Sequence, residues 1–385
     1  MLPPLEYLAW AIANYGQVRC DLASSGLAPL APEALAEPAE LLASATDPRA
    51  PRRWTEAIAA RFGVDPACAV ATLGTTHGLW AIYAALLSPG DDVVVESPAY
   101  EPLVRLAEGL GARVVPFARD LSRGAPVEPA AVAAAIGPRC KLVVLSNLHN
   151  PSGAYVDDAT LAEVAALARA RGARLVVDEV YRDLIDGRVD RGTTAFHAAP
   201  GIITTSSLTK VYGLGWARAG WVLAEPDVAR RVFDATLHST GGVSPALASL
   251  GLCAFARFAR LRDASLAARA DDEARAAQLE AFVDARPHLT WHGRRSARRS
   301  IFGFVSDARG VDLRPAIERA VREEQVIVAP GVFFGAPAGF RIRYGALAPS
   351  MFADGLARLG RVLDRDDEPS TLVRRAARGG PSRGP

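Results

Sequence analysis

Apolar and polar positions along the chain alternate between two spacings. Four segments carry apolar residues three or four positions apart, which is typical of amphipathic helices; they are 51–62, 77–87, 103–110 and 160–171. Short runs rich in β-branched residues favour strands; they are 92–96, 113–116, 141–146, 174–178 and 201–206. Strands that alternate with helices of this length form βαβ units, so the pattern predicts an α/β fold with a largely parallel sheet.

The pattern changes near residue 265. The Ala- and Arg-rich stretch 266–283 predicts a helix. After it come three short predicted strands, at 301–305, 326–329 and 340–344. One more helix is predicted at 312–323. This order is typical of a smaller α+β domain.

These changes divide the chain into four predicted parts. They are an N-terminal arm that also belongs in part to the small domain (1–45), a large domain (46–265), a small C-terminal domain (266–365) and a tail (366–385). The tail is polar and rich in Gly and Pro, so we expect it to be mobile.

Composition excludes several classes of protein. The 385 residues are 50% hydrophobic and 22% charged, as in ordinary globular proteins. A net charge of +2 gives no electrostatic case for binding nucleic acid. No apolar run reaches the roughly 18 residues that a membrane-spanning helix needs. The first residues include Glu6 and lack a basic cluster, so we expect no signal peptide.

The four cysteines lie far apart, at positions 20, 68, 140 and 253. No CxxC pair is present, so the sequence predicts no metal site. Scattered cysteines are typical of a reduced compartment, and we expect a cytoplasmic protein.

Lysine is rare in this chain. Of its 44 basic residues only Lys141 and Lys210 are lysines, so 42 are arginines. A GC-rich coding bias explains the arginines. A lysine that persists under such a bias is a candidate for chemistry that arginine cannot do, because only lysine readily loses its proton and forms a Schiff base.

We place four polar stretches at strand C-termini, where open α/β sheets bind ligands. They begin at Gly74, Ser146, Asp178 and Ser206. Taken singly, Gly74-Thr75-Thr76 also fits a plain helix cap, and Asn150-Pro151-Ser152-Gly153 also fits a plain turn.

The charged residues in and near these stretches indicate which ligand groups could bind there. Asp178 closes a buried strand, where an acid needs a cationic partner such as a protonated pyridine nitrogen. A helix that begins near Thr75 offers free N–H groups to a phosphate, and Arg218 could clamp the same group.

Two other interpretations of the stretch around Lys210 fail. Gly213-x-Gly215 is similar to a dinucleotide-binding loop, but the third glycine position is Arg218. Ser207-x-x-Lys210 matches the SxxK of penicillin-binding enzymes, which also need a KTG element. Lys141, the other lysine, is followed by leucine, so no KTG is present.

Taken together and in this order, these stretches resemble the class I/II aminotransferase family of pyridoxal-phosphate (PLP) enzymes. The resemblance rests on Asn150-Pro151-Ser152-Gly153, Asp178-Glu179-Val180-Tyr181 and Ser206–Lys210 with Arg218 eight residues later, and covers residues 20–360. It implies the PLP-dependent transferase fold of type I, PLP as cofactor, an amino-acid substrate and a homodimer with no nucleic-acid or membrane partner. It also implies transamination through an aldimine and a quinonoid intermediate.

The resemblance also implies roles for single residues. Lys210 would bind the cofactor and move protons, Asp178 would pair with the pyridine nitrogen, and Asn150 and Tyr181 would contact the phenolic oxygen. The implied phosphate contacts are Gly74, Thr75, Thr76, Ser207 and Arg218; Tyr100 would stack on the ring, and Gly26 and Arg341 would contact the substrate. Arg343 is the rival of Arg341, because both point to one face of a strand.

The sequence departs from the family near the start of the large domain. Family members carry a tyrosine that reaches the neighbouring subunit's phosphate, and then a glycine; here Ala45 and Ala50 stand at those positions. The alternative reaction is therefore a β- or γ-elimination, a replacement or a cyclisation, as in the capreomycidine synthases. The segment Ser24-Ser25-Gly26 of this chain resembles their N-terminal segment. A PLP-sensing regulator is disfavoured, because no DNA-binding domain fits before residue 21.

Overall fold

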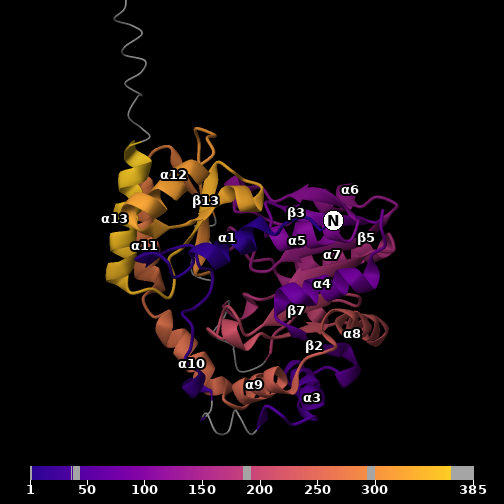
Figure 1. Ribbon diagram of the computed structural model, residues 1–385. Coiled ribbons are helices and arrows are strands. Elements are labelled where there is room, and N and C mark those ends of the chain that lie inside the picture. The colour runs from indigo at the N-terminus through magenta and orange to yellow at the C-terminus, as the bar shows by residue number, and fades with distance from the viewer. Residues whose placement is uncertain (1, 36, 38–43, 185–191, 293–299, 366–385) are drawn as a thin grey trace, which may run out of the picture.

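The computed structural model describes residues 2–35, 37, 44–184, 192–292 and 300–365 (Figure 1). Its largest sheet has seven strands in the order β2-β8-β7-β6-β5-β3-β4. In that order their bounds are Ala69–Leu73, Ala219–Leu223, Ile203–Ser207, Arg174–Asp178, Cys140–Ser146, Asp92–Ser97 and Arg113–Ala118. The ladders from β7 to β4 are parallel, and β8 runs antiparallel to both of its neighbours. The predicted α/β fold with a mostly parallel sheet is confirmed.

Helices bury both faces of this sheet. One face packs against α4, α5 and α8, and the other against α6 and α7. Their bounds are Thr75–Leu86, Glu101–Gly109, Pro226–Thr240, Pro129–Ala135 and Asp158–Ala170. Successive strand residues point to opposite faces, so Val93 and Val95 lie in one core and Val94 in the other. This double burial explains the continuous apolar runs of β3 and β5.

Two further helices, α3 (Ala50–Phe62) and α9 (Pro245–Ala256), pack together at the β2 end of the sheet. Trp54 of α3 is fully buried there, and its ring lies 4.5 Å from that of Phe255.

A second sheet of four antiparallel strands, in the order β12-β13-β10-β9, occupies the C-terminal part. Its strands are Ala329–Pro330, Gly339–Arg343, Phe302–Asp307 and Leu289–His292. Helices α11 (Asp272–Asp284), α12 (Arg314–Arg319) and α13 (Pro349–Arg365) supply its core. All strands of this sheet fall after residue 265, whereas the seven-stranded sheet lies between residues 69 and 223. The predicted domain boundaries stay predictions, and the predicted tail lies outside the described residues.

The N-terminal arm joins both parts of the molecule. Strand β1 (Cys20–Asp21) pairs in parallel with β11 (Val326–Ile327) of the C-terminal part. Helix α1 (Glu6–Asn14) lies between the two parts in Figure 1 and packs against Phe333 and Tyr100. The arm is therefore positioned to reach a site between the two sheets.

Several element bounds differ from the prediction. The single helix expected at 266–283 is two helices, α10 (Phe258–Ala268) and α11. The strand expected at 326–329 is two short strands, β11 and β12, and the helix expected at 312–323 is α12 followed by a π-helical turn, Ala320–Glu324. Helices α1, α6, α8, α9 and α13 were not predicted, and neither were strands β1, β2, β8 and β9. No described helix combines the length and apolar character that crossing a bilayer requires.

Glycine 78 sets how closely α4 approaches the sheet. A Cβ at this position would overlap Thr205 Oγ1, which is held by a hydrogen bond to the Trp221 carbonyl at 3.1 Å. Helix α4 begins at the candidate site, so its distance from the sheet fixes where its N-terminal groups lie.

We therefore expect Gly78→Ala to lower the free energy of unfolding by about 1–3 kcal/mol, because the extra methyl overpacks the contact between α4 and β7. Chemical denaturation measures this loss. Gly137→Ala is the control, since a Cβ there would meet only Asp92 Oδ2, at 3.8 Å. Equal stabilities of the two variants would contradict the packing argument.

Candidate active site

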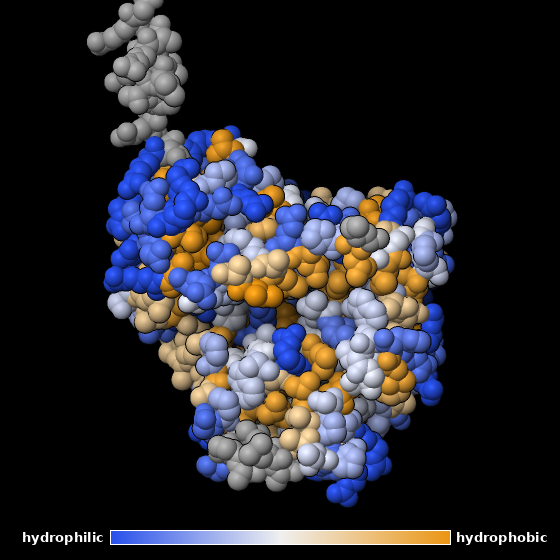
Figure 2. All heavy atoms as spheres, viewed as in Figure 1, coloured by the Kyte–Doolittle hydropathy of each residue, from blue (hydrophilic) through white to orange (hydrophobic). Residues whose placement is uncertain are grey.

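A cavity of about 380 Å³ lies at the carboxyl ends of β6 and β7, beside the N-terminus of α4. The face in Figure 2 is hollowed near its middle, where the two parts of the molecule meet. The lining residues are Tyr7, Leu8, Ile12, Ser25, Thr75, Thr76, Tyr100, Asn150, Asp178, Val180, Tyr181, Ser207, Thr209, Lys210 and Arg218. Nine of these are residues that the sequence singled out.

The other three predicted residues lie directly behind the cavity wall. Gly74 lies against Arg218, and Gly26 lies so close to Lys210 that a Cβ there would be 3.2 Å from the lysine Cδ. Arg341 donates a hydrogen bond from Nη1 to Asn150 Oδ1 at 2.7 Å. The structure therefore brings all twelve predicted residues to one place, although they span more than 300 positions of the chain.

One end of the cavity is built to hold an anion. The N-terminus of α4 opens toward it, and Thr75 Oγ1 donates to Ser207 Oγ at 3.1 Å. Arg218 adds a full positive charge, and its guanidinium is fixed by the carbonyls of Leu73 at 3.1 Å and Gly215 at 3.3 Å. Backbone N–H groups, hydroxyls and a guanidinium together match a phosphate group.

Gly74 is required by the same arrangement. Its φ of 81° is left-handed, and a Cβ would lie 2.7 Å from Arg218 Nη2. Any larger residue would strain the backbone and displace the guanidinium.

Asp178 ends β6 and supplies a buried acid. Its side chain is 3% exposed, and one carboxylate oxygen accepts a hydrogen bond from the Val180 N–H at 3.0 Å. Burial raises the pKa of Asp178 to about 7, and the negative charge of Glu96 adds to the rise. The Val180 hydrogen bond and the Lys210 charge act in the opposite direction. A cationic partner in the cavity would stabilise the ionised form.

Lys210 lies shortly after β7, and its side chain lines the cavity. Burial lowers the pKa of its amine, and the positive charges of Arg341 and Arg218 add to this effect. The lysine thus has a larger neutral fraction than an exposed one, and only the neutral amine is a nucleophile.

Two arginines of β13 face the same side, as the strand spacing predicted. Arg341 is fully buried and contacts Asn150, whereas Arg343 donates to the carbonyls of Gly26 at 2.8 Å and Asp21 at 3.1 Å. Among the described residues the Nε of each of these two arginines has no hydrogen-bond partner, but only Arg341 donates to side chains that line the cavity, those of Asn150 and Tyr7. The preference for Arg341 over Arg343 as the arginine that faces the site is therefore supported by its contacts.

Two tyrosines complete the wall. Tyr181 donates from its hydroxyl to Ser25 Oγ at 2.8 Å, and burial raises its pKa. Tyr100 immediately precedes α5; burial raises the pKa of its phenol as well, although a hydrogen bond with Thr76 works against the rise. Both phenols are therefore neutral donors at ordinary pH.

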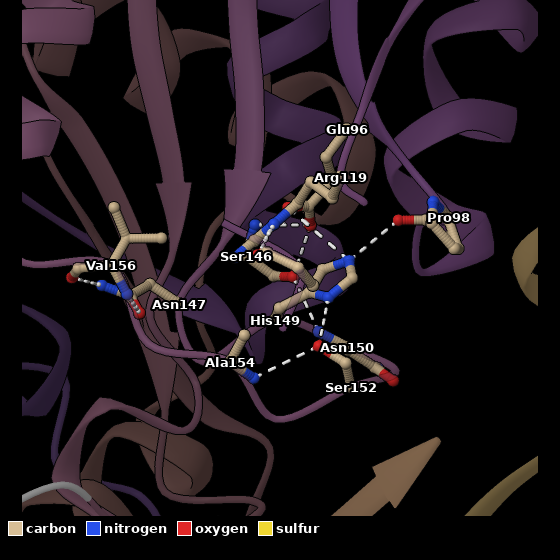
Figure 3. Close-up of polar contacts among 11 residues, drawn as sticks. Glu96, Pro98, Arg119, Ser146, Asn147, His149, Asn150, Ser152, Ala154 and Val156 are labelled. Carbon is tan, nitrogen blue, oxygen red and sulfur yellow. Dashed lines mark hydrogen bonds and ion pairs between the residues drawn. The ribbon is translucent and has the colours of Figure 1, made fainter. Parts of the chain in front are cut away.

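A buried polar network supports the Asn150 turn from behind (Figure 3). Arg119 Nη1 and Glu96 form an ion pair at 2.7 Å with both side chains fully buried. The other oxygen of Glu96 accepts from the N–H of Ser146, and Ser146 Oγ accepts from the N–H of Asn150 at 3.0 Å. The ion pair thus fixes the backbone of Asn150 through one serine.

His149 belongs to this network and not to the cavity lining. Burial and the charge of Arg119 hold its pKa well below the usual value, so the ring is neutral. Its Nε2–H donates to the Pro98 carbonyl at 2.9 Å, and Nδ1 accepts from Ser152 Oγ at 2.7 Å. The ring therefore ties the Asn150 turn to the segment that precedes Tyr100.

Several lining residues were missed by sequence reasoning. Thr209 adjoins Lys210 and could have been inferred from that position alone. Tyr7, Leu8 and Ile12 come from α1, and no local signal links that helix to the site.

Comparison with known proteins agrees with this geometry. The family described as Aminotransferase class I and II matches residues 31–359. The chain belongs to this family. It is thus a PLP-dependent aminotransferase-family enzyme, and the resemblance inferred from its motifs is confirmed.

Relatives and solved structures extend the comparison. An aspartate aminotransferase of Streptomyces avermitilis is 26% identical over 318 residues, which cover 78% of this chain and 76% of the relative. The capreomycidine synthase of Streptomyces vinaceus is 27% identical over 380 residues, which cover 94% of each chain. A PLP-dependent aminotransferase of Streptococcus suis shares the fold with a TM-score of 0.82, at 22% identity over 96% of this chain and 100% of that one.

The pKa of Asp178 predicts how stability varies with pH. Between an unfolded value of about 4 and a folded value of about 7, the folded chain keeps a proton that the unfolded chain has lost. The free energy of unfolding of the cofactor-free protein therefore falls as the pH rises through this window, by an amount on the order of 4 kcal/mol. Asp178→Asn removes this contribution.

Thermal unfolding of both cofactor-free proteins at a series of pH values measures the effect. We expect the melting temperature of the wild type to fall relative to that of Asp178→Asn from pH about 4 to about 7 and then to stay parallel. A constant difference across that range would contradict the raised pKa.

Proposed function

We propose that this enzyme binds PLP through Lys210 and transfers the amino group of an amino acid to the cofactor. The observation that carries the proposal is that Lys210, with its lowered pKa, lines the same cavity as the buried acid Asp178 and Arg218 of the anion-binding end. An amine, an acid and an anion site at one cavity match the aldehyde, the pyridine nitrogen and the phosphate of PLP.

The residues present fit that cofactor. Thr75, Thr76, Ser207 and Arg218 line the cavity, where they could contact the phosphate, and Gly74 has no side chain that would displace Arg218. We assign Asp178 to the pyridine nitrogen, Asn150 and Tyr181 to the phenolic oxygen, and Tyr100 to the face of the ring, as the family resemblance implies.

When bound, PLP supplies an electrophilic carbon and a ring that accepts the electron pair of a bond broken at the substrate. The protein supplies position and protons. The neutral Lys210 amine accepts the α-proton of the substrate and gives it up again within the cavity. The Asp178 carboxylate holds the proton of the pyridine nitrogen, and Tyr181 donates from its hydroxyl.

The substrate class follows from Arg341. Its buried guanidinium, with Nε unpaired among the described residues, matches the α-carboxylate of an amino acid. Gly26 lies where a substrate would be covered by the N-terminal arm. We further propose a homodimer, as the resemblance implies, and a cytoplasmic protein, as the scattered cysteines indicate. The net charge and the short apolar runs favour neither nucleic acid nor a membrane as partner.

The second candidate function is elimination, replacement or cyclisation of a hydroxylated amino acid. It is favoured by the capreomycidine synthase relative, whose similarity covers 94% of both chains, against 78% and 76% for the aspartate aminotransferase. Ala45 and Ala50 in place of the expected tyrosine and glycine point the same way. Both reactions use the same proton transfer at Lys210 and differ in the bond broken next.

Lys210→Ala tests the proposed attachment. After incubation with PLP and reduction with borohydride, we expect the wild type to carry covalently bound cofactor and the variant to carry none, as mass spectrometry of peptides would show. Lys141→Ala is the matched control, because Lys141 is the other lysine of the chain and lies exposed on β5. Cofactor fixed equally to Lys210→Ala would refute the assignment.

The two candidate functions differ in their products. We expect a panel of amino acids, including hydroxylated arginines, to give a keto acid and the aminated cofactor in equal amounts. Product analysis by mass spectrometry and cofactor absorbance measures both. Loss of water or ammonia without the aminated cofactor would instead establish elimination or cyclisation.

A further inference from the structure

Helix α1 brings a tyrosine into the candidate active site. Tyr7 lines the cavity and is 3% exposed. Its ring centroid lies 5.7 Å from that of Tyr100 and 5.8 Å from that of Phe333. The carboxylate of Glu101 accepts hydrogen bonds from the first two N–H groups of α1, at 3.0 and 2.7 Å. Both the ring and the backbone of Tyr7 are therefore held in place.

The phenol of Tyr7 contacts the proposed carboxylate-binding arginine. Arg341 Nη2 donates to Tyr7 Oη and to the Ala23 carbonyl, each at 2.8 Å. Tyr15 Oη lies 2.8 Å from Tyr7 Oη and donates its own proton to the same carbonyl at 3.2 Å. In this arrangement the Tyr7 hydroxyl accepts from Arg341 and donates to Tyr15, so its proton sits on a rotatable O–H beside the guanidinium.

The charges around Tyr7 strengthen it as a donor. Burial by itself would raise the pKa of this phenol, but the positive charges of Arg341 and Lys210, together with the hydrogen bonds to Tyr15 and Arg341, lower it. A more acidic hydroxyl makes a stronger hydrogen bond to an anion.

A carboxylate that enters this site needs more donors than Arg341 alone offers. It has about four lone-pair sites, and each one left unpaired away from water costs free energy. Arg341 already shares Nη2 with Tyr7 and Nη1 with Asn150. The phenol is thus the neighbouring donor whose proton can turn toward the anion while its oxygen still accepts from the arginine.

We propose that Tyr7 is a further substrate-binding residue, which donates a hydrogen bond to the carboxylate held by Arg341 and makes the N-terminal helix part of the binding site. The inference rests on the proposed function, because that function brings the carboxylate to Arg341. The ring of Tyr7 packs against its aromatic neighbours, as theirs do against it. The hydroxyl of Tyr7 has a separate role, which is to bind the carboxylate.

Tyr7→Phe tests this, since it removes the hydroxyl and keeps the ring. The PLP-loaded protein is titrated with the standard amino acids, and the half-saturation concentration is read from the cofactor absorbance. We expect the variant to bind the best of these amino acids about 10- to 100-fold more weakly than the wild type does. Its affinity for the corresponding amine, which lacks the carboxylate, should not change.

Tyr83→Phe is the matched control. Its hydroxyl is also buried and makes one hydrogen bond, to the Leu103 carbonyl at 2.9 Å, but it does not line the cavity. We expect this variant to bind amino acid and amine as the wild type does. The melting temperatures of both variants report any loss of folding separately from loss of binding.

The outcomes separate this inference from the proposed function. Equal or tighter binding of the amino acid by Tyr7→Phe, or an equal loss for acid and amine, would overturn the inference. If Arg341→Gln weakens amino-acid binding in that case, the proposed function stands without it. If no amino acid changes the wild-type absorbance, or if Arg341→Gln binds amino acids as the wild type does, the inference about Tyr7 and the proposed function are both refuted.

Discussion

The burial of charge at one edge of a parallel sheet is the constraint on which this structure depends. Asp178 ends a central strand and is 3% exposed, and Arg341 is fully buried on the four-stranded sheet. Burying either charge away from water costs free energy unless an oppositely charged or hydrogen-bonding partner compensates. The surrounding hydroxyls, amides and backbone groups pair with these two charges in part. The ligand must supply the remaining partners, so the unpaired groups determine which charges the ligand carries.

The same constraint explains why the site lies between the two sheets. The seven-stranded sheet supplies the acid, the lysine and the anion-binding end, and the four-stranded sheet supplies the arginine. Asn150 joins them, because its side chain accepts from Arg341 while its backbone is fixed by Ser146 and, through it, by Glu96. A change in the distance between the sheets would therefore alter the hydrogen bond between the Asn150 side chain and Arg341.

Much of this site was predictable because it is encoded in short stretches. Asn150-Pro151-Ser152-Gly153 and Asp178-Glu179-Val180-Tyr181 each follow a strand that periodicity predicts, and the parallel order of those strands brings their ends together. The alternating helices and strands were likewise visible, because both faces of the sheet are buried.

The rest depended on contacts that no local pattern records. Tyr7 meets Arg341 across 334 positions, and His149 reaches back 51 positions to the Pro98 carbonyl. Helix α9 was missed because its sequence is apolar on every side, so it shows no amphipathic period. The break between α10 and α11 was missed because arginine and alanine favour a helix on both sides of it.

The pairing of β1 with β11 also bears on how the chain reaches its final form. Strand β1 finds its partner only when residues 326–327 have been made, and the Leu22 carbonyl accepts from the N–H of Arg343. Contacts so distant along the chain form late, because a long loop must close first. The large sheet lies between residues 69 and 223 and can assemble before residues 326–327 are made, whereas the arm that carries Tyr7 docks only after them, so the site is completed late.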